Sequence, residues 1–115
     1  MTTISVRQAV VVSGQSMSEI VDLAGATAVV GVVMPTANWK DAAVTVQGSP
    51  DGINFFDMYD GVAAKELAFN AHVGSLVMLN PNRMRCCKAI ILRSGTQAAP
   101  VVQPQTTIFG VVVES

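Results

Sequence analysis

The chain has 115 residues, a formal net charge of -1, and 13% charged against 50% hydrophobic residues. Its length fits one domain with a core of its own, and its apolar content excludes a disordered chain. Soluble domains carry about 25% charged residues, so this surface has unusually few. The balance of 7 basic and 8 acidic residues argues against the positive footprint that nucleic acids or anionic lipids require. We therefore expect neither nucleic acid nor a membrane as a partner.

Nothing in the sequence directs the chain across a membrane. The longest apolar stretch, residues 28–34, is far shorter than the about 20 residues needed to span a bilayer. The first residues also lack the basic-then-apolar order of a signal peptide. We expect a chain that stays in the cytoplasm where it is made, with its cysteines reduced.

The β-branched residues predict an all-β fold. Valine, isoleucine and threonine make up 33 of the 115 residues, and their stiff side chains suit a pleated sheet better than a helix. They fall into short segments separated by turn residues, the pattern of a sandwich or barrel. In chain order the predicted strands are residues 4–12, 17–23, 28–34, 43–49, 54–59, 65–71, 75–79, 86–93 and 106–113.

The first three segments differ in their patterns. Residues 4–12 form a clear strand that ends at Ser13-Gly14, whereas residues 17–23 mix apolar and polar positions and indicate a short or edge strand. Residues 28–34 are apolar throughout. This run is expected for a strand that is covered on both faces or that lies against another subunit.

The most secure hairpin joins residues 43–49 to residues 54–59. Residues 43–49 alternate, and Ser49-Pro50-Asp51-Gly52 then supplies turn chemistry. Proline fixes φ at the second position, and Asp-Gly tolerates the left-handed region.

The later segments are less regular. Residues 65–71 alternate, although Val62-Ala63-Ala64 just before them would also suit a helical turn; we expect a strand. Residues 75–79 and 86–93 flank an Asn80-Pro81-Asn82 turn. Residues 98–105 carry two prolines, which predict an exposed or edge-running arm before the last strand.

These elements predict a single antiparallel β-sandwich over residues 1–115, of jelly-roll type, with eight or nine short strands. Residues 1–18 are an extended N-terminal strand or arm in this scheme.

Few residues can carry catalytic chemistry. His72 is the sole histidine, so a Ser-His-Asp or Cys-His arrangement would depend on it, and a loop histidine is the simpler interpretation. Cys86 and Cys87 are adjacent, poorly placed to bond to each other and short of the ligands for zinc. We expect one inward thiol, one incidental thiol, no enzyme activity, no cofactor and no bound metal.

Two alternatives stay open. Asp51, Asp57 and Asp60 lie close in sequence and could form a small calcium site, although turn-forming aspartates explain them more simply. Trp39 follows a proline-bearing loop, where a lone tryptophan usually packs as a plug at the end of a sandwich core. It could instead be a sugar platform, with Phe55, Phe56 and Tyr59 as the other available aromatics.

Several stretches together resemble small proteins of tailed bacteriophages and prophages. The likeness lies in residues at turns and strand starts and extends over residues 20–113, whereas residues 1–18 match least. The stretches are Val33-Met34-Pro35 with Trp39, residues 42–52, residues 55–60, residues 92–96, and residues 100–103 with the final strand. The most similar group is the β-sandwich head decoration (cement) proteins, which carry no active site.

The resemblance implies a structural virion protein made in the bacterial cytoplasm. Its partners would be the major capsid protein and copies of itself, as a homo-oligomer. The alternative is a carbohydrate- or receptor-binding module of a phage fibre or tail. Ranked by irregularity and neutral apolar content, the candidate interface residues are Val10, Val12, Met34, Pro35, Trp39, Pro100, Val101, Val102 and Pro104.

Overall fold

The computed structural model describes residues 3–61, 65–69 and 72–115. This part of the chain forms eleven strand segments and no helix. It accordingly holds no helix long and apolar enough to cross a membrane. The segments are β1 (Ile4–Val11), β2 (Val21–Asp22), β3 (Ala28–Val33), β4 (Val44–Ser49), β5 (Phe56–Asp57), β6 (Tyr59–Asp60), β7 (Lys65–Glu66), β8 (Ala68–Phe69), β9 (Leu76–Met78), β10 (Ala89–Ser94) and β11 (Thr107–Glu114).

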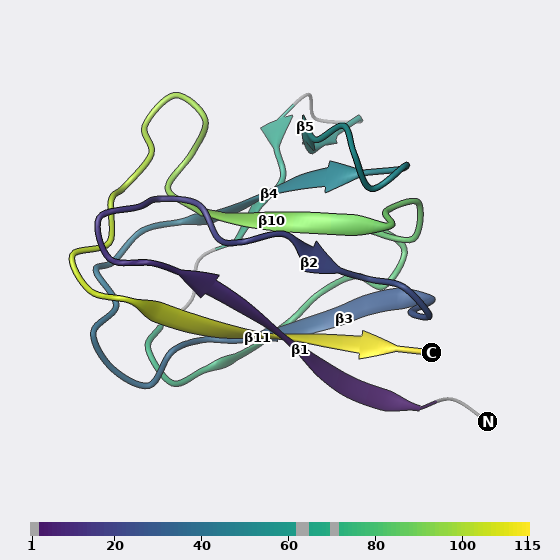
Figure 1. Cartoon of the computed structure of the whole chain (residues 1–115), viewed down its shortest axis with the longest axis horizontal. Coiled ribbons are helices and arrows are strands. Elements are labelled where there is room, and N and C mark those ends of the chain that lie inside the picture. The colour runs from purple at the N-terminus through teal and green to yellow at the C-terminus, as the bar shows by residue number, and fades with distance from the viewer. Residues whose placement is uncertain (1–2, 62–64, 70–71) are drawn as a thin grey trace.

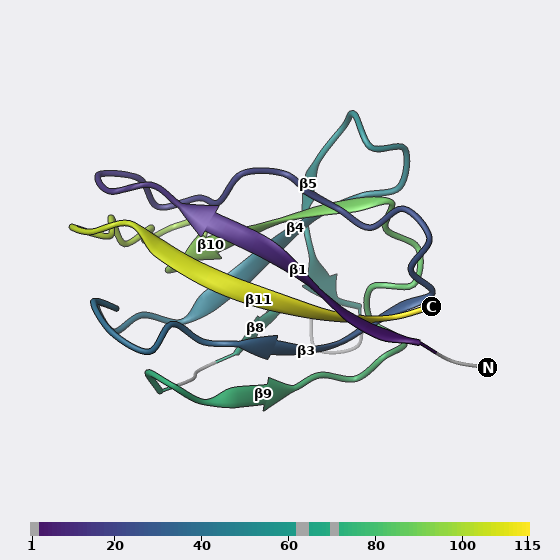
Figure 2. The ribbon, with the colours of Figure 1, turned by 60° about the horizontal axis from the view of Figure 1, so that its bottom comes forward.

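Two antiparallel sheets form the sandwich (Figures 1 and 2). Sheet A has the strand order β1-β11-β3-β9, and sheet B has the order β2-β10-β4-β5, with β8 also pairing with β4. The chain therefore passes from one sheet to the other at most connections, and its first and last strands lie side by side. This interleaved order is that of a jelly roll, which confirms the predicted fold class. A small hairpin of β6 and β7 completes the described structure.

The core lies between the two sheets. Phe109, Val111 and Val113 alternate inward from β11, and the facing residues of sheet B include Ile90 and Leu92. Trp39 closes the core, with its ring edge-on to that of Phe109 at 5.2 Å between centroids. The prediction of Trp39 as a core plug is confirmed.

Several predicted boundaries need correction. The hairpin at residues 49–52 is confirmed, because β4 pairs with β5 and Gly52 adopts a positive φ of 82°. The expected strands 54–59 and 65–71, however, break into four two-residue pieces, β5 to β8, which raises the number of segments above eight or nine.

The strand predicted for residues 86–93 begins only at Ala89. Cys86 and Cys87 thus lie before β10 and not on a strand, although one thiol is exposed and the other half-buried, as expected. Residues 62–64, where a helical turn was the alternative, and residues 70–71 fall outside the described part of the chain.

The N-terminal segment is a strand, one of the two forms expected, and segment 98–105 is largely exposed as expected, except at Gln103. Residues 4–11 are an integral strand, since β1 pairs with β11 along its whole length; residues 1–2 lie outside the description. The segment 98–105 is anchored at its centre by Gln103, whose side chain is fully buried. Its amide accepts a hydrogen bond from the main-chain N–H of Lys40 and donates to the carbonyl of Lys40 and to Ser94 Oγ, all within 2.9 Å.

We predict that Gln103→Ala lowers the free energy of unfolding by about 2 kcal/mol, because it leaves the buried hydroxyl of Ser94 and the partly buried main-chain groups of Lys40 without partners. The measurement is urea denaturation of the purified protein. Gln105→Ala, at an exposed position two residues away, is the matched control and should be nearly neutral. Equal effects of the two changes would contradict the anchoring role of Gln103.

Candidate functional site

The outer face of sheet A is the main candidate site. Side chains alternate between the two faces of a strand, so the registers of β1, β11, β3 and β9 define which residues share the outer face. Two rows cross all four strands, and a third row crosses β1 and β11. The rows are Val6-Val112-Gly31-Met78, Gln8-Gly110-Val33-Leu76 and Val10-Ile108.

This outer face is apolar and well exposed. Val6 and Leu76 are each 58% exposed, and Met78 is 73% exposed. Sheet A is thus apolar on both sides, although the chain itself covers only one of them. Monomeric soluble proteins rarely leave a large contiguous apolar patch open, and such a patch commonly marks a protein interface.

The same face is almost free of charge. Among the residues of its four strands, only Arg7 and Glu114 are charged. Arg7 turns to the other side of the sheet, where its guanidinium donates to the main-chain carbonyls of Asp22 (2.6 Å) and Ala24 (3.0 Å). Glu114 lies at the end of β11, beside the termini, which leaves the centre of the face neutral.

Two glycines, Gly31 and Gly110, lie at the centre of the face. Gly110 lies between Val6 and Val33, and a Cβ added there would come within 2.9 Å of Val6 Cγ1 and 3.3 Å of Val33 Cβ. A Cβ added at Gly31 would meet the main-chain oxygen of Val77 at 3.0 Å. Neighbouring atoms therefore leave little room for a side chain at either position.

The outer face of sheet B is polar instead. Arg93 of β10 is 5% exposed and forms ion pairs with Asp57 (2.5 Å) and Glu66 (2.9 Å), which come from β5 and β7. Asp57 also accepts a hydrogen bond from Gln47. The hydrogen bond from Arg93 outweighs burial and holds the pKa of Asp57 below its ordinary value. This network ties the short strands β5 and β7 to the sheet.

The predicted interface residues do not form one surface. Met34, Pro35 and Trp39 are buried in the chain, which corrects the expectation that they contact a partner. Their apolar character stabilises the core and not an interface. Val10, half-buried, belongs to the outer face of sheet A.

The remaining predicted residues lie at the end of the sandwich where β1 finishes. Val12 is exposed there, and a main-chain hydrogen bond from Gly14 to Gln103 brings it near the segment 100–104. In that segment Pro100, Val102 and Pro104 are exposed and Val101 is half-buried.

Prediction from the sequence missed most of the outer face. Val6, Val33, Leu76, Met78 and Ile108 were not singled out, because each is an ordinary residue of a strand. One signal did point there, namely the unbroken apolar run of residues 28–34. The run Val111-Val112-Val113 carries the same signal, since adjacent valines must face both sides of the sheet.

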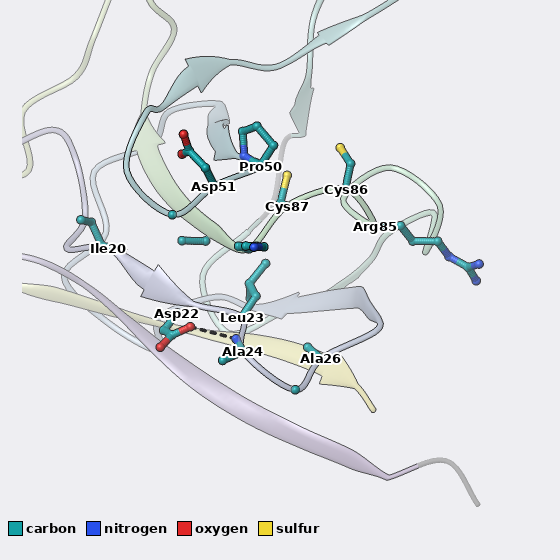
Figure 3. A pocket seen from close by; sticks show the side chains of 14 residues that line it. Ile20, Asp22, Leu23, Ala24, Ala26, Pro50, Asp51, Arg85, Cys86 and Cys87 are labelled. Atoms are coloured by element: carbon teal, nitrogen blue, oxygen red, sulfur yellow. Dashed lines mark hydrogen bonds between the residues drawn. The ribbon is translucent and has the colours of Figure 1, made fainter.

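A hollow of about 720 Å³ opens between β2, the β4–β5 turn and the turn before β10 (Figure 3). Burial raises the pKa of the Cys87 thiol to about 11, so this thiol stays protonated at neutral pH. Asp22 accepts a hydrogen bond from the Ala24 N–H at 2.8 Å. Asp51, Arg85, Cys86 and Lys88 also line the hollow.

Two of the three aspartates considered for calcium, Asp51 and Asp57, are engaged by other groups of the chain. Asp51 accepts hydrogen bonds from the main-chain N–H groups of Asn54 and Ile53 and from the side chains of Asn54 and Ser49, which hold its pKa well below the ordinary range. Asp57 is bound to Arg93, and the side chain of Asp60 lies outside the description. No metal-binding group of three or more His, Cys, Asp or Glu residues occurs among the described residues.

The structure also shows the environments of His72 and Trp39, the other two residues considered for a functional role. His72 is exposed, and its main-chain carbonyl accepts a hydrogen bond from Ser75 Oγ in the turn before β9. Burial of Trp39 removes the aromatic ring on which a sugar platform would chiefly depend.

Comparisons with protein-family models, with curated proteins and with solved structures each find no match to this chain. Its function is therefore inferred from its own residues and geometry.

We predict that Asp57→Asn lowers the free energy of unfolding by about 2 kcal/mol at pH 7, because it removes one of the two charged partners of buried Arg93. The pKa of Asp57 is lowered in the folded state, so its contribution is present above the ordinary value of 3.8 and is lost as pH falls through the lower folded value. The difference between wild type and variant should therefore shrink below about pH 4.

The measurement is chemical denaturation at a series of pH values. Asp41→Asn, which changes an exposed aspartate, should have little effect at any of them. A difference between wild type and Asp57→Asn that stays constant down to pH 2 would contradict the assigned ion pair.

Proposed function

We propose that the chain is a structural virion protein of the capsid decoration (cement) type, which docks on a phage head through the outer face of sheet A. The observation that carries this proposal is the neutral, apolar outer face on a sheet whose other side already forms the core. A face of this kind is suited to burial against another protein, because its centre carries no charge that would have to be desolvated in the interface.

The size of the face favours binding in many copies. Four strands about 4.8 Å apart and up to eight residues long at about 3.4 Å each give a face of roughly 400 Å². A standard stable interface buries about 800 Å² on each partner, so one such contact alone is weak. A capsid lattice supplies many symmetric copies of the same site, and contacts between decoration subunits then add avidity.

The composition agrees with this role. A protein that is covered by neighbours for most of its life can keep a surface with 13% charged residues, whereas a free monomer depends on charge for solubility. The resemblance of residues 20–113 to phage head decoration proteins points in the same direction. The proposed partners are the major capsid protein and copies of the chain itself, and the proposed location is the virion.

The proposal predicts that the purified protein binds empty capsids of the phage or prophage that encodes it. Ile108→Lys places a charge on the outer face of sheet A and should weaken this binding by about tenfold or more, because the charge must be desolvated in the interface. Co-sedimentation of protein with capsids at a series of concentrations measures the effect.

Ile53→Lys is the matched control. Ile53 is also an exposed isoleucine, at 80% exposure, but it lies in the β4–β5 turn outside the proposed face. This variant should bind as the wild type does. Failure of the wild-type protein to bind capsids, or equal binding by Ile108→Lys and wild type, would contradict the proposal.

A further inference from the structure

The edge of sheet A at β1 carries main-chain groups that point away from the sheet. Thr3 and Ser115 exchange two hydrogen bonds, of 2.8 and 2.9 Å, across the β1–β11 pair. Bonded and non-bonded pairs alternate along an antiparallel ladder. The N–H and C=O groups of Ile4, Val6 and Gln8 consequently face outward, away from β11.

This outward edge is open over residues 4–8. The next outward carbonyl, that of Val10, already accepts a hydrogen bond from the Glu19 N–H at 3.0 Å. β1 ends the strand order of sheet A, so no strand in the described parts of the chain pairs with its outer side.

β1 differs from the other sheet edges. The edge strands β2, β5 and β8 have two residues each and β9 has three, whereas β1 has eight. Proteins commonly protect an edge by keeping it short or by placing proline or an inward-pointing charge on it. β1 has no proline; its one charged residue, Arg7, points to the inner side of the sheet, where it donates to the carbonyls of Asp22 and Ala24, and it is the one device of this kind on β1.

We propose that β1 pairs antiparallel with β1 of a second copy, about a two-fold axis at Val6. In this register Val6 lies opposite Val6 of the second copy, and Ile4 lies opposite Gln8 on either side of the axis. The three pairs together make about six main-chain hydrogen bonds. Each copy offers the same segment, as a two-fold interface requires.

The residues of β1 favour this register over its neighbours. An axis at Arg7 would set two arginines opposite each other, and an axis at Gln8 would need the Val10 carbonyl that Glu19 already occupies. With the axis at Val6, Arg7 lies opposite Ser5 and keeps its own hydrogen bonds.

The pairing also extends the candidate site. Val6 belongs to the outer face of sheet A, so joining two copies at β1 makes one continuous eight-stranded sheet with an apolar outer face on both halves. The footprint per bound unit doubles, toward the about 800 Å² of a standard interface. The inference deepens the self-association within the proposed function, but it does not depend on capsid binding.

The first test is the oligomeric state of the full chain, without capsids. Light scattering after size-exclusion chromatography should show a molar mass that rises with concentration from 12.0 kDa toward twice that value. Val6→Pro removes an outward N–H without touching a bond to β11, and the variant should stay at 12.0 kDa over the same range.

Met78→Pro is the matched control, since Met78 is an exposed apolar residue whose N–H faces outward from the opposite edge of the same sheet. This variant should associate as the wild type does. A monomeric wild type at all concentrations, or unchanged association of folded Val6→Pro, overturns the proposal.

A second variant keeps the proposal testable if Val6→Pro fails to fold. In a Cys86→Ser background, Val6→Cys should form a disulfide-linked dimer under mild oxidation, because opposed residues lie about 5.5 Å apart at Cα. Ser5→Cys in the same background should form far less, since its copies lie diagonally and beyond bridging distance.

Equal cross-linking of the two cysteine variants overturns the pairing at Val6. Because these measurements contain no capsid, their failure would leave capsid binding to its own test, and loss of capsid binding would leave the dimer standing.

Discussion

The pairing of β11 with β1 on one side and with β3 on the other is the constraint on which the rest of the structure depends. Its register sends Phe109, Val111 and Val113 into the core and Ile108 and Val112 to the outside. It also turns alternate main-chain groups of β1 away from the sheet. The core, the apolar outer face and the open edge therefore all follow from one ladder, because a shift by one residue would exchange the two faces.

The two outer faces of the sandwich differ in polarity. On sheet B, the ion pairs of Arg93 with Asp57 and Glu66 close a polar surface within the chain. On sheet A, the outer residues are apolar apart from Gln8, and no other strand among the described residues covers them. The few charges of the chain therefore lie mainly away from the outer face of sheet A.

Much of the fold could be predicted from local patterns, and most of the site could not. The turn at Pro50-Asp51-Gly52 has a chemistry that acts within four residues, so the hairpin after β4 was predictable. Met34 and Pro35, named as interface candidates, are buried, and Trp39, expected as either a core plug or an interface residue, is a core plug; their burial depends on strands far away in the sequence. The burial of Gln103 was equally unpredictable, because a polar residue in a proline-bearing segment is expected to be exposed. It is buried since Lys40 and Ser94 form hydrogen bonds with its amide.

The sequence by itself determined an all-β sandwich, its main strands and its low charge, because side-chain alternation and turn chemistry are local properties. Only the tertiary structure decided which strands are neighbours, and with that which apolar side of each strand faces the core. Val6 and Val11 look alike in the sequence, yet Val11 is buried and Val6 is exposed at an open edge. The difference arises from pairing between β1 and β11, whose partners lie about a hundred residues apart and cannot be assigned from local pattern.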